Sequence, residues 1–387
     1  MCSGAAATLL RATFLWTIYD RTKSPAMLGL AGLLSFLPAP FASLAGGAIA
    51  DAFDRRRVIL LAQMVALACA IGLAFVSAST SGGVAPLIGL VVMNAVAGSF
   101  EAPARSAMLP GLVPREEYGR AVTVMATAQS LAFMSGPAIA GVLIGHGGVR
   151  VAFTVSAVLY GASLVSVSGL PAGTSSAGKR AISVGGLIEG LTFVWRNKPV
   201  LAAMSLDLFA VIFGGATALL PVFANDILRV GPKGYGVLTS SLEVGAVVTS
   251  VLLLVLPPIR RVGRAIVVTV AAYGLATLAF GLSTSFPLSV ACYVLVGMAD
   301  QVSVVSRATL VQMSTPDEVR GRVSSVNMIF IGASNQLSAA EAGFVAALTS
   351  AKISVVFGGA MVLVVVTIAA LAVPTLWGWR HAERSTG

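Results

Sequence analysis

The sequence predicts an all-α membrane protein with about twelve transmembrane helices arranged as two six-helix repeats. Three observations lead to this fold class. Of the 387 residues, 57% are hydrophobic and only 10% are charged, far from the composition of an ordinary soluble domain. The apolar residues form long runs separated by short polar gaps. The two halves of the chain also share a residue pattern.

A helix needs about 20 apolar residues to cross the hydrocarbon core of a bilayer. By that rule the expected spans are residues 3–19, 26–50, 58–78, 84–107, 119–145, 149–170, 199–225, 234–257, 265–283, 287–311, 321–346 and 353–378. Glycine and proline interrupt many of these runs, which membrane helices tolerate because neighbouring helices satisfy the freed backbone groups.

The Lys and Arg residues in the loops predict the orientation of the chain. With a cytoplasmic amino terminus, most of these residues fall on the cytoplasmic side, including Arg55, Arg56 and Arg57. This excess predicts an even number of helices with both termini in the cytoplasm. The net charge of +10 therefore indicates membrane topology, and we expect no nucleic-acid partner.

A long polar gap divides the chain. The expected parts are a six-helix bundle at 1–170, a cytoplasmic linker at 171–198, a second bundle at 199–378 and a cytoplasmic tail at 379–387. Within the linker, Leu187, Leu191 and either Val194 or Trp195 fall on one helical face, and Arg196 and Lys198 follow. This pattern is typical of a helix that lies on the membrane surface, although a flexible connector remains an alternative.

The halves repeat in two registers. Arg105, Pro114, Gly119, Arg120 and Gly141 recur at one common offset as Arg307, Pro316, Gly321, Arg322 and Gly343, and Gly29, Ser43 and Arg57 recur as Gly236, Ser250 and Arg264. Two registers in the same order predict parallel repeats joined by the linker. This architecture is typical of transporters in which the substrate lies between the halves.

A charged segment stands between the second and third spans. It contains Gly47, Asp51, Asp54 and the run Arg55 to Arg57. The spacing is similar to the signature Gly-x-x-x-Asp-Arg-x-Gly-Arg-Arg of the major facilitator superfamily, with Ala52 in place of a basic residue and Asp54 in place of the glycine. Asp54 before three arginines resembles the branch of siderophore and drug exporters.

This resemblance implies a gate on the cytoplasmic side. Asp51 would dock at the amino terminus of helix eleven near Gly321, where the helix dipole favours a carboxylate. Arg105 and Arg322 would pair helices across the same face and share in gating. The alternative is that the arginines only fix topology.

Gly136, Pro137 and Gly141 in the fifth span resemble the antiporter motif of superfamily exporters. Small residues let helices pack closely and proline bends a helix, so close packing alone also explains the motif.

Five ionisable residues fall inside apolar spans, where each is a functional hypothesis. They are Asp300, Glu243, Asp207, Glu341 and Arg11. Asp300 lies in the middle of its span and is the first candidate for carrying protons, and Glu243 is the second. Asp207 and Glu341 lie nearer their segment ends and could instead reach a loop cation. A structural polar contact is the alternative for each acid. Arg11 could be a counter-charge or part of an anionic substrate site.

The sequence lacks the residue patterns that metal binding, disulfide formation or nucleotide binding would require. His146 and His381 have no second ligand at metal spacing, so no metal site is expected. Cys2, Cys69 and Cys292 are expected to be free thiols. No nucleotide-binding loop is present, which leaves the proton gradient as the expected energy source and no cofactor.

The resemblance implies a proton-coupled secondary transporter that exports a small amphipathic molecule, a drug or a siderophore, across the bacterial inner membrane. We expect it to act as a monomer in the lipid bilayer. An importer of a polar nutrient is the alternative, and a polytopic membrane enzyme is less expected. Compared with the family, the first helix is expected to be short, or the true start to lie upstream of Met1.

Overall fold

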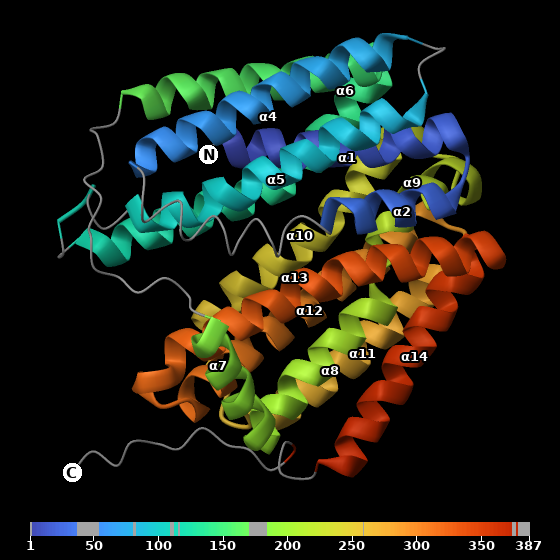
Figure 1. The fold of residues 1–387 in the computed structure, drawn as a ribbon. Helices are drawn as coiled ribbons and strands as arrows, with labels where there is room; N and C mark the ends of the chain where they lie inside the picture. The colour runs from blue at the N-terminus through green and yellow to red at the C-terminus, as the bar shows by residue number, and fades with distance from the viewer. Residues whose placement is uncertain are drawn as a thin grey trace. The chain divides into compact units, whose positions relative to one another are not determined.

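The computed structural model describes residues 2–36, 54–79, 83–108, 112–114, 117–169, 184–257, 259–373 and 377. Within these residues every regular element is helical (Figure 1), which confirms the all-α prediction. The elements are α1 (Cys2–Thr22), α2 (Pro25–Phe36), α4 (Arg55–Ala78), α5 (Val84–Met108), α6 (Tyr118–Ser168), α7 (Val184–Arg196), α8 (Lys198–Gly214), η3 (Ala216–Leu219), α9 (Leu220–Val222), η4 (Phe223–Ile227), α10 (Gly231–Val255), α11 (Val262–Leu282), α12 (Phe286–Ser314), α13 (Asp317–Leu348) and α14 (Ala351–Ala372).

Most of the predicted spans correspond to one of these helices. Eight segments of the described chain are long and apolar enough to cross a membrane: Arg55–Ala78, Val84–Arg105, Tyr118–Ser168, Lys198–Ile227, Gly231–Val255, Val262–Leu282, Phe286–Ser314 and Ala351–Ala372. Two further predicted spans coincide with α1 and α13, which have 21 and 32 residues. The predicted span 26–50 begins with α2, and its remainder lies outside the described residues.

The fifth and sixth predicted spans are confirmed as two helices that join at Gly148. We expected separate helices at 119–145 and 149–170, and the 51 residues labelled α6 are two helices that meet at Gly148, whose φ of 76° is not helical. A straight helix of this length would measure about 75 Å, far more than the bilayer thickness. The bend therefore supplies two membrane crossings without a loop, and glycine tolerates the positive φ that it requires.

The seventh span is a broken helix, whereas the sequence predicted a continuous one at 199–225. After Gly214 the chain continues through η3, α9 and a π-helical turn. The hydroxyl of Ser338 donates a hydrogen bond of 3.2 Å to the carbonyl of Gly215. This bond satisfies a backbone group that the break leaves free, as a membrane interior requires.

Polar residues mark several helix starts. The carboxylate of Asp54 accepts a hydrogen bond of 3.0 Å from the Arg56 amide and caps α4. The hydroxyl of Ser350 accepts one of 3.2 Å from Ile353 and caps α14. The helix α13 begins at Asp317, one turn earlier than the predicted 321, because the proline and acidic residues before that point suit a helix start.

The chain separates into two compact units. The first consists of Met1–Ile182 and Leu220–Ser240, and the second of Ser183–Leu219 and Ser241–Gly387. In the first unit α1 packs on α6, and α4 packs on α5 and α6. In the second unit α11 packs on α12 and α14, while α8 packs on α13 and α14. The linker contains a helix, α7, which packs on α13, so a wholly flexible connector is ruled out for that part.

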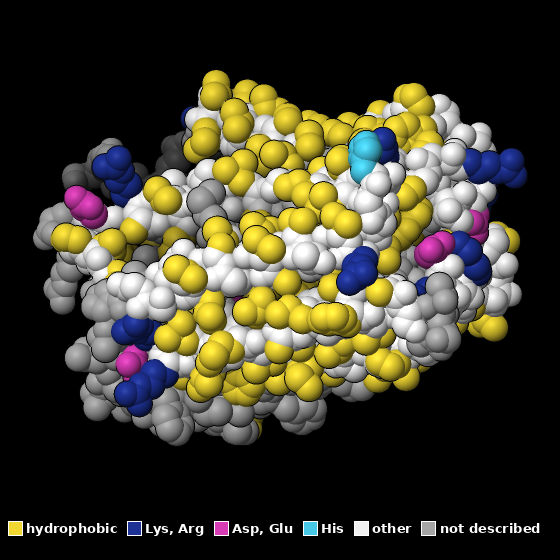
Figure 2. Space-filling view, turned by 90° about the horizontal axis from the view of Figure 1, so that it is seen from above, with side chains coloured by type: hydrophobic (Ala, Val, Ile, Leu, Met, Phe, Trp, Pro, Cys, Tyr) yellow, Lys and Arg dark blue, Asp and Glu magenta, His cyan; other side chains and the backbone are white. Residues whose placement is uncertain are grey.

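The surface of the described helices is rich in apolar side chains. Phe75, Leu254 and Leu348 are each more than two thirds exposed. Figure 2 shows apolar side chains over most of the visible face, with most of the charged side chains nearer its two ends. An apolar outer surface of this kind suits contact with lipid tails, which agrees with a polytopic membrane protein.

Candidate functional site

A buried ion pair joins two helices of the second unit. The guanidinium of Arg307 on α12 donates to the Oδ2 carboxylate oxygen of Asp207 on α8. Their side chains are 5% and 9% exposed. A charge this deeply buried needs a partner, and each of these residues is the partner of the other. Asp207 therefore does not reach a loop cation, which we had considered from its place near a segment end.

A small cavity lies beside this pair. It has a volume of about 10 Å³, enough for about one water molecule. Its lining residues come from α8, α11 and α12: Asp207, Ala210, Val211, Val270, Tyr273, Asp300 and Ser303. On α12, Asp300, Ser303 and Arg307 follow one another at helical spacing and share a face. Asp300 and Asp207 thus line the same water-sized cavity.

The charges of this cluster do not balance when all groups are ionised. Arg307 compensates Asp207, whereas Asp300 makes no ion pair or hydrogen bond with another described residue. Two carboxylates and one guanidinium leave one net negative charge. The uptake of one proton by Asp300 makes the three groups neutral as a set. The arrangement can therefore hold and release one proton at Asp300.

Glu243 lies next to the same helix. It is on α10, which meets α12 where Gly245 and Gly297 bring the two backbones together. A Cβ added at Gly297 would lie 1.9 Å from the carbonyl oxygen of Leu242. This close packing places Glu243 within electrostatic reach of Asp300. The structure thus brings together three of the four predicted acids.

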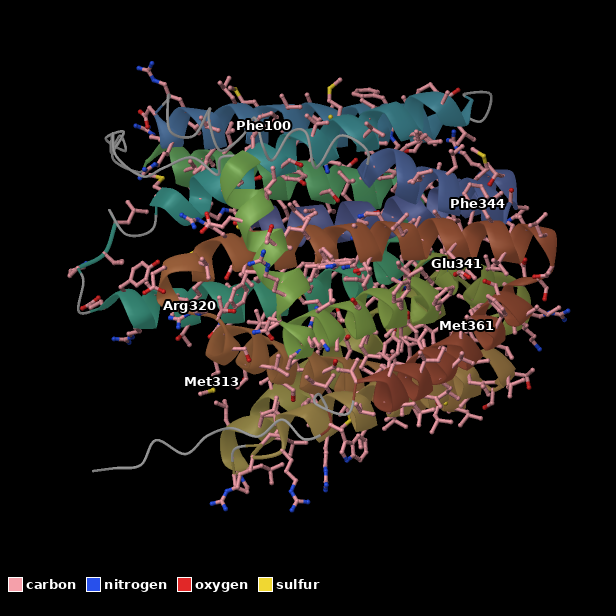
Figure 3. The ribbon with its side chains drawn as sticks, turned by 60° about the horizontal axis from the view of Figure 1, so that its bottom comes forward. Phe100, Met313, Arg320, Glu341, Phe344 and Met361 are labelled. Carbon is pink, nitrogen blue, oxygen red and sulfur yellow. The ribbon has the colours of Figure 1, made fainter. Side chains whose placement is uncertain are left out.

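The other two predicted ionisable residues lie elsewhere. Glu341 is on α13, and in Figure 3 it lies with Phe344 far along that helix from Arg320. Both carboxylate oxygens of Glu341 are buried and have no hydrogen-bond partner among the described residues. Arg11 belongs to α1 of the first unit, and its side chain is exposed.

The predicted gate is only partly described. Gly47 and Asp51 lie outside the described residues, so the docking of Asp51 stays a prediction. Asp54 caps α4, and Arg55, Arg56 and Arg57 form its first turn. The guanidinium of Arg56 donates to the carbonyl of Ser168 at the end of α6. The arginine run therefore has a structural contact in addition to any role in topology.

Arg105 and Arg322 each have a carboxylate partner within their own unit. Arg105 pairs with Glu101 on α5 and donates a hydrogen bond of 2.6 Å to the hydroxyl of Ser3 on α1. Arg322 pairs with Glu189 of the linker helix α7, a contact that the sequence did not predict.

Gly321 lies within the second turn of α13, with no atom within 4 Å of the place where a Cβ would stand. The position is therefore open, and it is not crowded by the residues that the structure describes.

The antiporter-like motif packs closely within the first unit. A Cβ at Gly136 would lie 2.0 Å from the Thr8 hydroxyl of α1, and one at Gly141 would lie 2.6 Å from the carbonyl of Pro232. Pro137 lies within α6 between these two contacts. Close packing thus accounts for both glycines, and an additional role in export stays a prediction.

The sequence analysis missed Arg307 as a member of the site. It appeared there only as a repeat match of Arg105. A signal was available, because Arg307 falls inside the predicted span 287–311 and stands seven residues after Asp300. A basic residue at that depth requires an acid nearby.

A helical membrane protein with a buried charged cluster in one of its two repeats has the architecture of a secondary transporter. The family model of the Major Facilitator Superfamily matches residues 1–339. The chain belongs to this superfamily of membrane transporters, as the signature near Asp51 implied.

Curated relatives of the chain are efflux proteins. The multidrug efflux pump Tap of Mycobacterium tuberculosis is 26% identical, with 81% of this chain and 77% of the relative covered. Macrolide efflux protein A of Streptococcus pyogenes is 22% identical over 83% and 80% of the two chains. The enterobactin exporter EntS of Escherichia coli is 25% identical over 73% and 68%.

Solved structures share the fold at low sequence identity. A peptide transporter has a TM-score of 0.77 at 14% identity, with 97% of this chain and 93% of the other covered. A D-xylose-proton symporter has a TM-score of 0.72 at 12% identity, with 98% of both chains covered. These likenesses show that the chain has the superfamily fold of two six-helix repeats.

Proposed function

We propose that this transporter couples the entry of protons to the export of a small amphipathic molecule by alternating access. The proposal rests on the position of Asp300. Its carboxyl group lies beside the buried Asp207–Arg307 ion pair and makes no ion pair or hydrogen bond with another described residue. An ionisable group inside a membrane span is costly, and proton relays are a main reason for keeping one.

The chemistry assigns a role to each member of the cluster. Asp300 takes up and releases the proton. Arg307 lies on the same face of α12, so its guanidinium is attracted by Asp300 only when Asp300 is ionised. Loss of the proton therefore weakens the hold of Arg307 on Asp207, and proton uptake restores it. Because Asp207 is on α8, this exchange links proton binding to the contact between α8 and α12.

Direction and substrate follow from the relatives by analogy. Their names refer to efflux of drugs, of macrolides and of a siderophore. We infer export of a drug-like or siderophore-like molecule across the bacterial inner membrane, with both termini in the cytoplasm and the chain acting as a monomer. The proton gradient is the only energy source in this proposal, and Asp51, docked near Gly321, serves as the cytoplasmic gate.

The test uses inverted membrane vesicles that contain the full chain. A proton gradient should drive accumulation of dyes from a fluorescent drug panel, and Asp300→Asn should abolish the response to the gradient. The variant should still exchange dye down its concentration gradient, because the transport path is intact. Asp20→Asn, which removes an exposed carboxylate of the first unit, is the matched control and should behave as the wild type.

The outcomes separate a coupling role from a folding defect. Loss of both gradient-driven and downhill transport would indicate that Asp300 maintains the structure. Gradient-driven transport at full strength and with normal pH dependence would remove Asp300 as the coupling residue. Accumulation in the opposite direction would overturn export in favour of import.

A further inference from the structure

The linker helix α7 directly precedes a segment that is long and apolar enough to cross a membrane. It ends at Arg196, and the membrane-spanning segment that starts with α8 begins at Lys198. Asn197 alone separates them, and its side chain caps α8 by accepting a hydrogen bond of 3.3 Å from Val200. The C-terminal end of α7 therefore lies close to the boundary between water and lipid.

One face of α7 is fixed to α13. Val194 is fully buried, and a Cβ at Gly190 would lie 2.8 Å from the carbonyl oxygen of Arg322. Glu189 forms an ion pair with the same arginine. These contacts hold α7 against the start of α13 at a defined rotation about its own axis.

That rotation leaves an apolar stripe of α7 uncovered by the other residues that the structure describes. Ile188, Leu191 and Trp195 are 60%, 45% and 72% exposed. Their spacing of three and four residues places them on one side of the helix. Three large apolar side chains in a row at a membrane surface are typical of a helix that dips into the lipid interface, and Trp is enriched at that depth.

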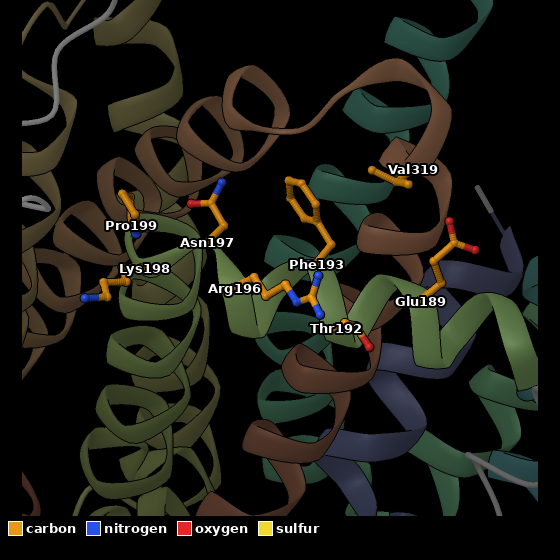
Figure 4. Close-up of a pocket in the computed structure, with 8 residues that line it drawn as sticks. All are labelled: Glu189, Thr192, Phe193, Arg196, Asn197, Lys198, Pro199 and Val319. Atoms are coloured by element: carbon orange, nitrogen blue, oxygen red, sulfur yellow. The ribbon is translucent and has the colours of Figure 1, made fainter.

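A basic cavity adjoins the stripe where α7 meets α8. Its volume is about 770 Å³ and it is lined by Glu189, Thr192, Phe193, Arg196, Asn197, Lys198, Pro199 and Val319. Figure 4 shows the side chains of Arg196 and Lys198 at this junction, with their charged ends directed away from each other. Neither makes an ion pair with another described residue, whereas Glu189 is already neutralised by Arg322. The charge available to a ligand in this cavity is therefore positive.

We propose that α7 is a binding site for anionic phospholipids of the bilayer in which the protein resides. Headgroup phosphates bind to Arg196 and to Lys198 at the junction of α7 and α8, and the apolar stripe rests on the acyl region of the same leaflet. A basic pair beside an interfacial apolar stripe has the two properties that attract a helix to an anionic membrane surface. Because α7 is fixed to α13, the bound lipid also restrains the start of α13.

The test places a single fluorescent reporter in the stripe. The chain has four tryptophans, so Trp16→Phe, Trp377→Phe and Trp379→Phe together leave only Trp195. The full-length variant is placed in phosphatidylcholine vesicles that contain an equal fraction of either brominated phosphatidylcholine or brominated phosphatidylglycerol. Both lipids should quench Trp195, and the brominated phosphatidylglycerol should quench it more strongly.

Charge variants then test the headgroup site. Arg196→Gln and Lys198→Gln should each lower the preference for phosphatidylglycerol about fivefold and leave quenching by phosphatidylcholine unchanged. The control is Arg261→Gln, which removes one positive charge from another exposed loop and should preserve the preference. The unmodified chain gives a second measurement, because short-chain phosphatidylglycerol in detergent should raise its melting temperature more than phosphatidylcholine does.

Several results would overturn the proposal. Equal quenching by the two lipids would show an interfacial helix without a headgroup site. Loss of the preference on adding inorganic phosphate at constant ionic strength would show a site for a soluble anion. If acrylamide quenches Trp195 and the brominated lipids do not, the side chain lies in water. If neither acrylamide nor lipid quenches Trp195, the side chain is covered by protein.

Discussion

Two arginines at equivalent positions of the repeats have different partners. Arg105 in the first unit pairs with Glu101, one turn earlier on its own helix, and its side chain is 39% exposed. Arg307 in the second unit pairs with Asp207 on another helix, and its side chain is 5% exposed. A pair within one helix forms wherever that helix forms, whereas a pair between helices ties their positions together.

The acids near these arginines also differ. At the offset that relates Arg105 to Arg307, Glu101 corresponds to Ser303, and Gly98 corresponds to Asp300. The only carboxyl at these positions in the first unit is engaged by its arginine, whereas the second unit has an additional carboxyl beside a complete ion pair. The two repeats thus share the arginine and differ in the number of carboxyl groups beside it.

The largest expected effect comes from removing the acid of the buried pair. Asp207→Asn leaves the Arg307 guanidinium buried without a counter-charge, which should lower the free energy of unfolding by about 3–5 kcal/mol. Glu101→Gln in the first unit should cost about 1 kcal/mol or less, because that pair is partly exposed. Unfolding of the purified chains in detergent measures both.

A double variant checks the cause of this difference. Asp207→Asn combined with Arg307→Gln removes both charges and should recover most of the lost stability. If the double variant is as unstable as the single one, the loss comes from packing, and the contrast between the two arginines does not depend on charge.

An intermediate effect on stability is expected from substituting a glycine on α12, compared with a glycine on α5. Gly297→Ala pushes a methyl group against the Leu242 carbonyl and should destabilise the chain by about 1–3 kcal/mol. Gly98→Ala meets open space and should change stability by about 1 kcal/mol or less, because alanine favours a helix. Equal melting temperatures for the two variants would mean that α10 and α12 do not pack as closely as described.

The smallest effect concerns two serines. Ser3→Ala removes the hydroxyl that accepts a hydrogen bond from Arg105 and should cost about 1 kcal/mol. The hydroxyl of Ser306 is buried without a hydrogen-bond partner among the described residues, so Ser306→Ala should be neutral or stabilising. Thermal unfolding compares the two variants. A larger loss of stability for Ser306→Ala than for Ser3→Ala would contradict the description of Ser3 as hydrogen-bonded and of Ser306 as lacking a partner.

Composition and the spacing of apolar runs were sufficient to predict the fold class and most of the spans. The boundary between the fifth and sixth spans was predicted between residues 145 and 149, and the structure places it at Gly148. The break after Gly214 was missed, because Ser338, which compensates it, lies on another helix.

The candidate site was predicted residue by residue but not as a group. Asp207, Glu243 and Asp300 were recognised because ionisable residues stand out in apolar spans. Their assembly around Arg307 depends on how α8, α10 and α12 pack, and sequence spacing within one helix does not contain that information.

The bend at Gly148 also has a consequence for the biosynthesis of the protein. The two crossings of α6 share one non-helical residue as their connection, so the insertion machinery has no polar loop to hold outside while the second crossing enters the bilayer. The segment Tyr118–Ser168 is therefore expected to enter the membrane as a pair, with Gly148 as the point about which the chain turns.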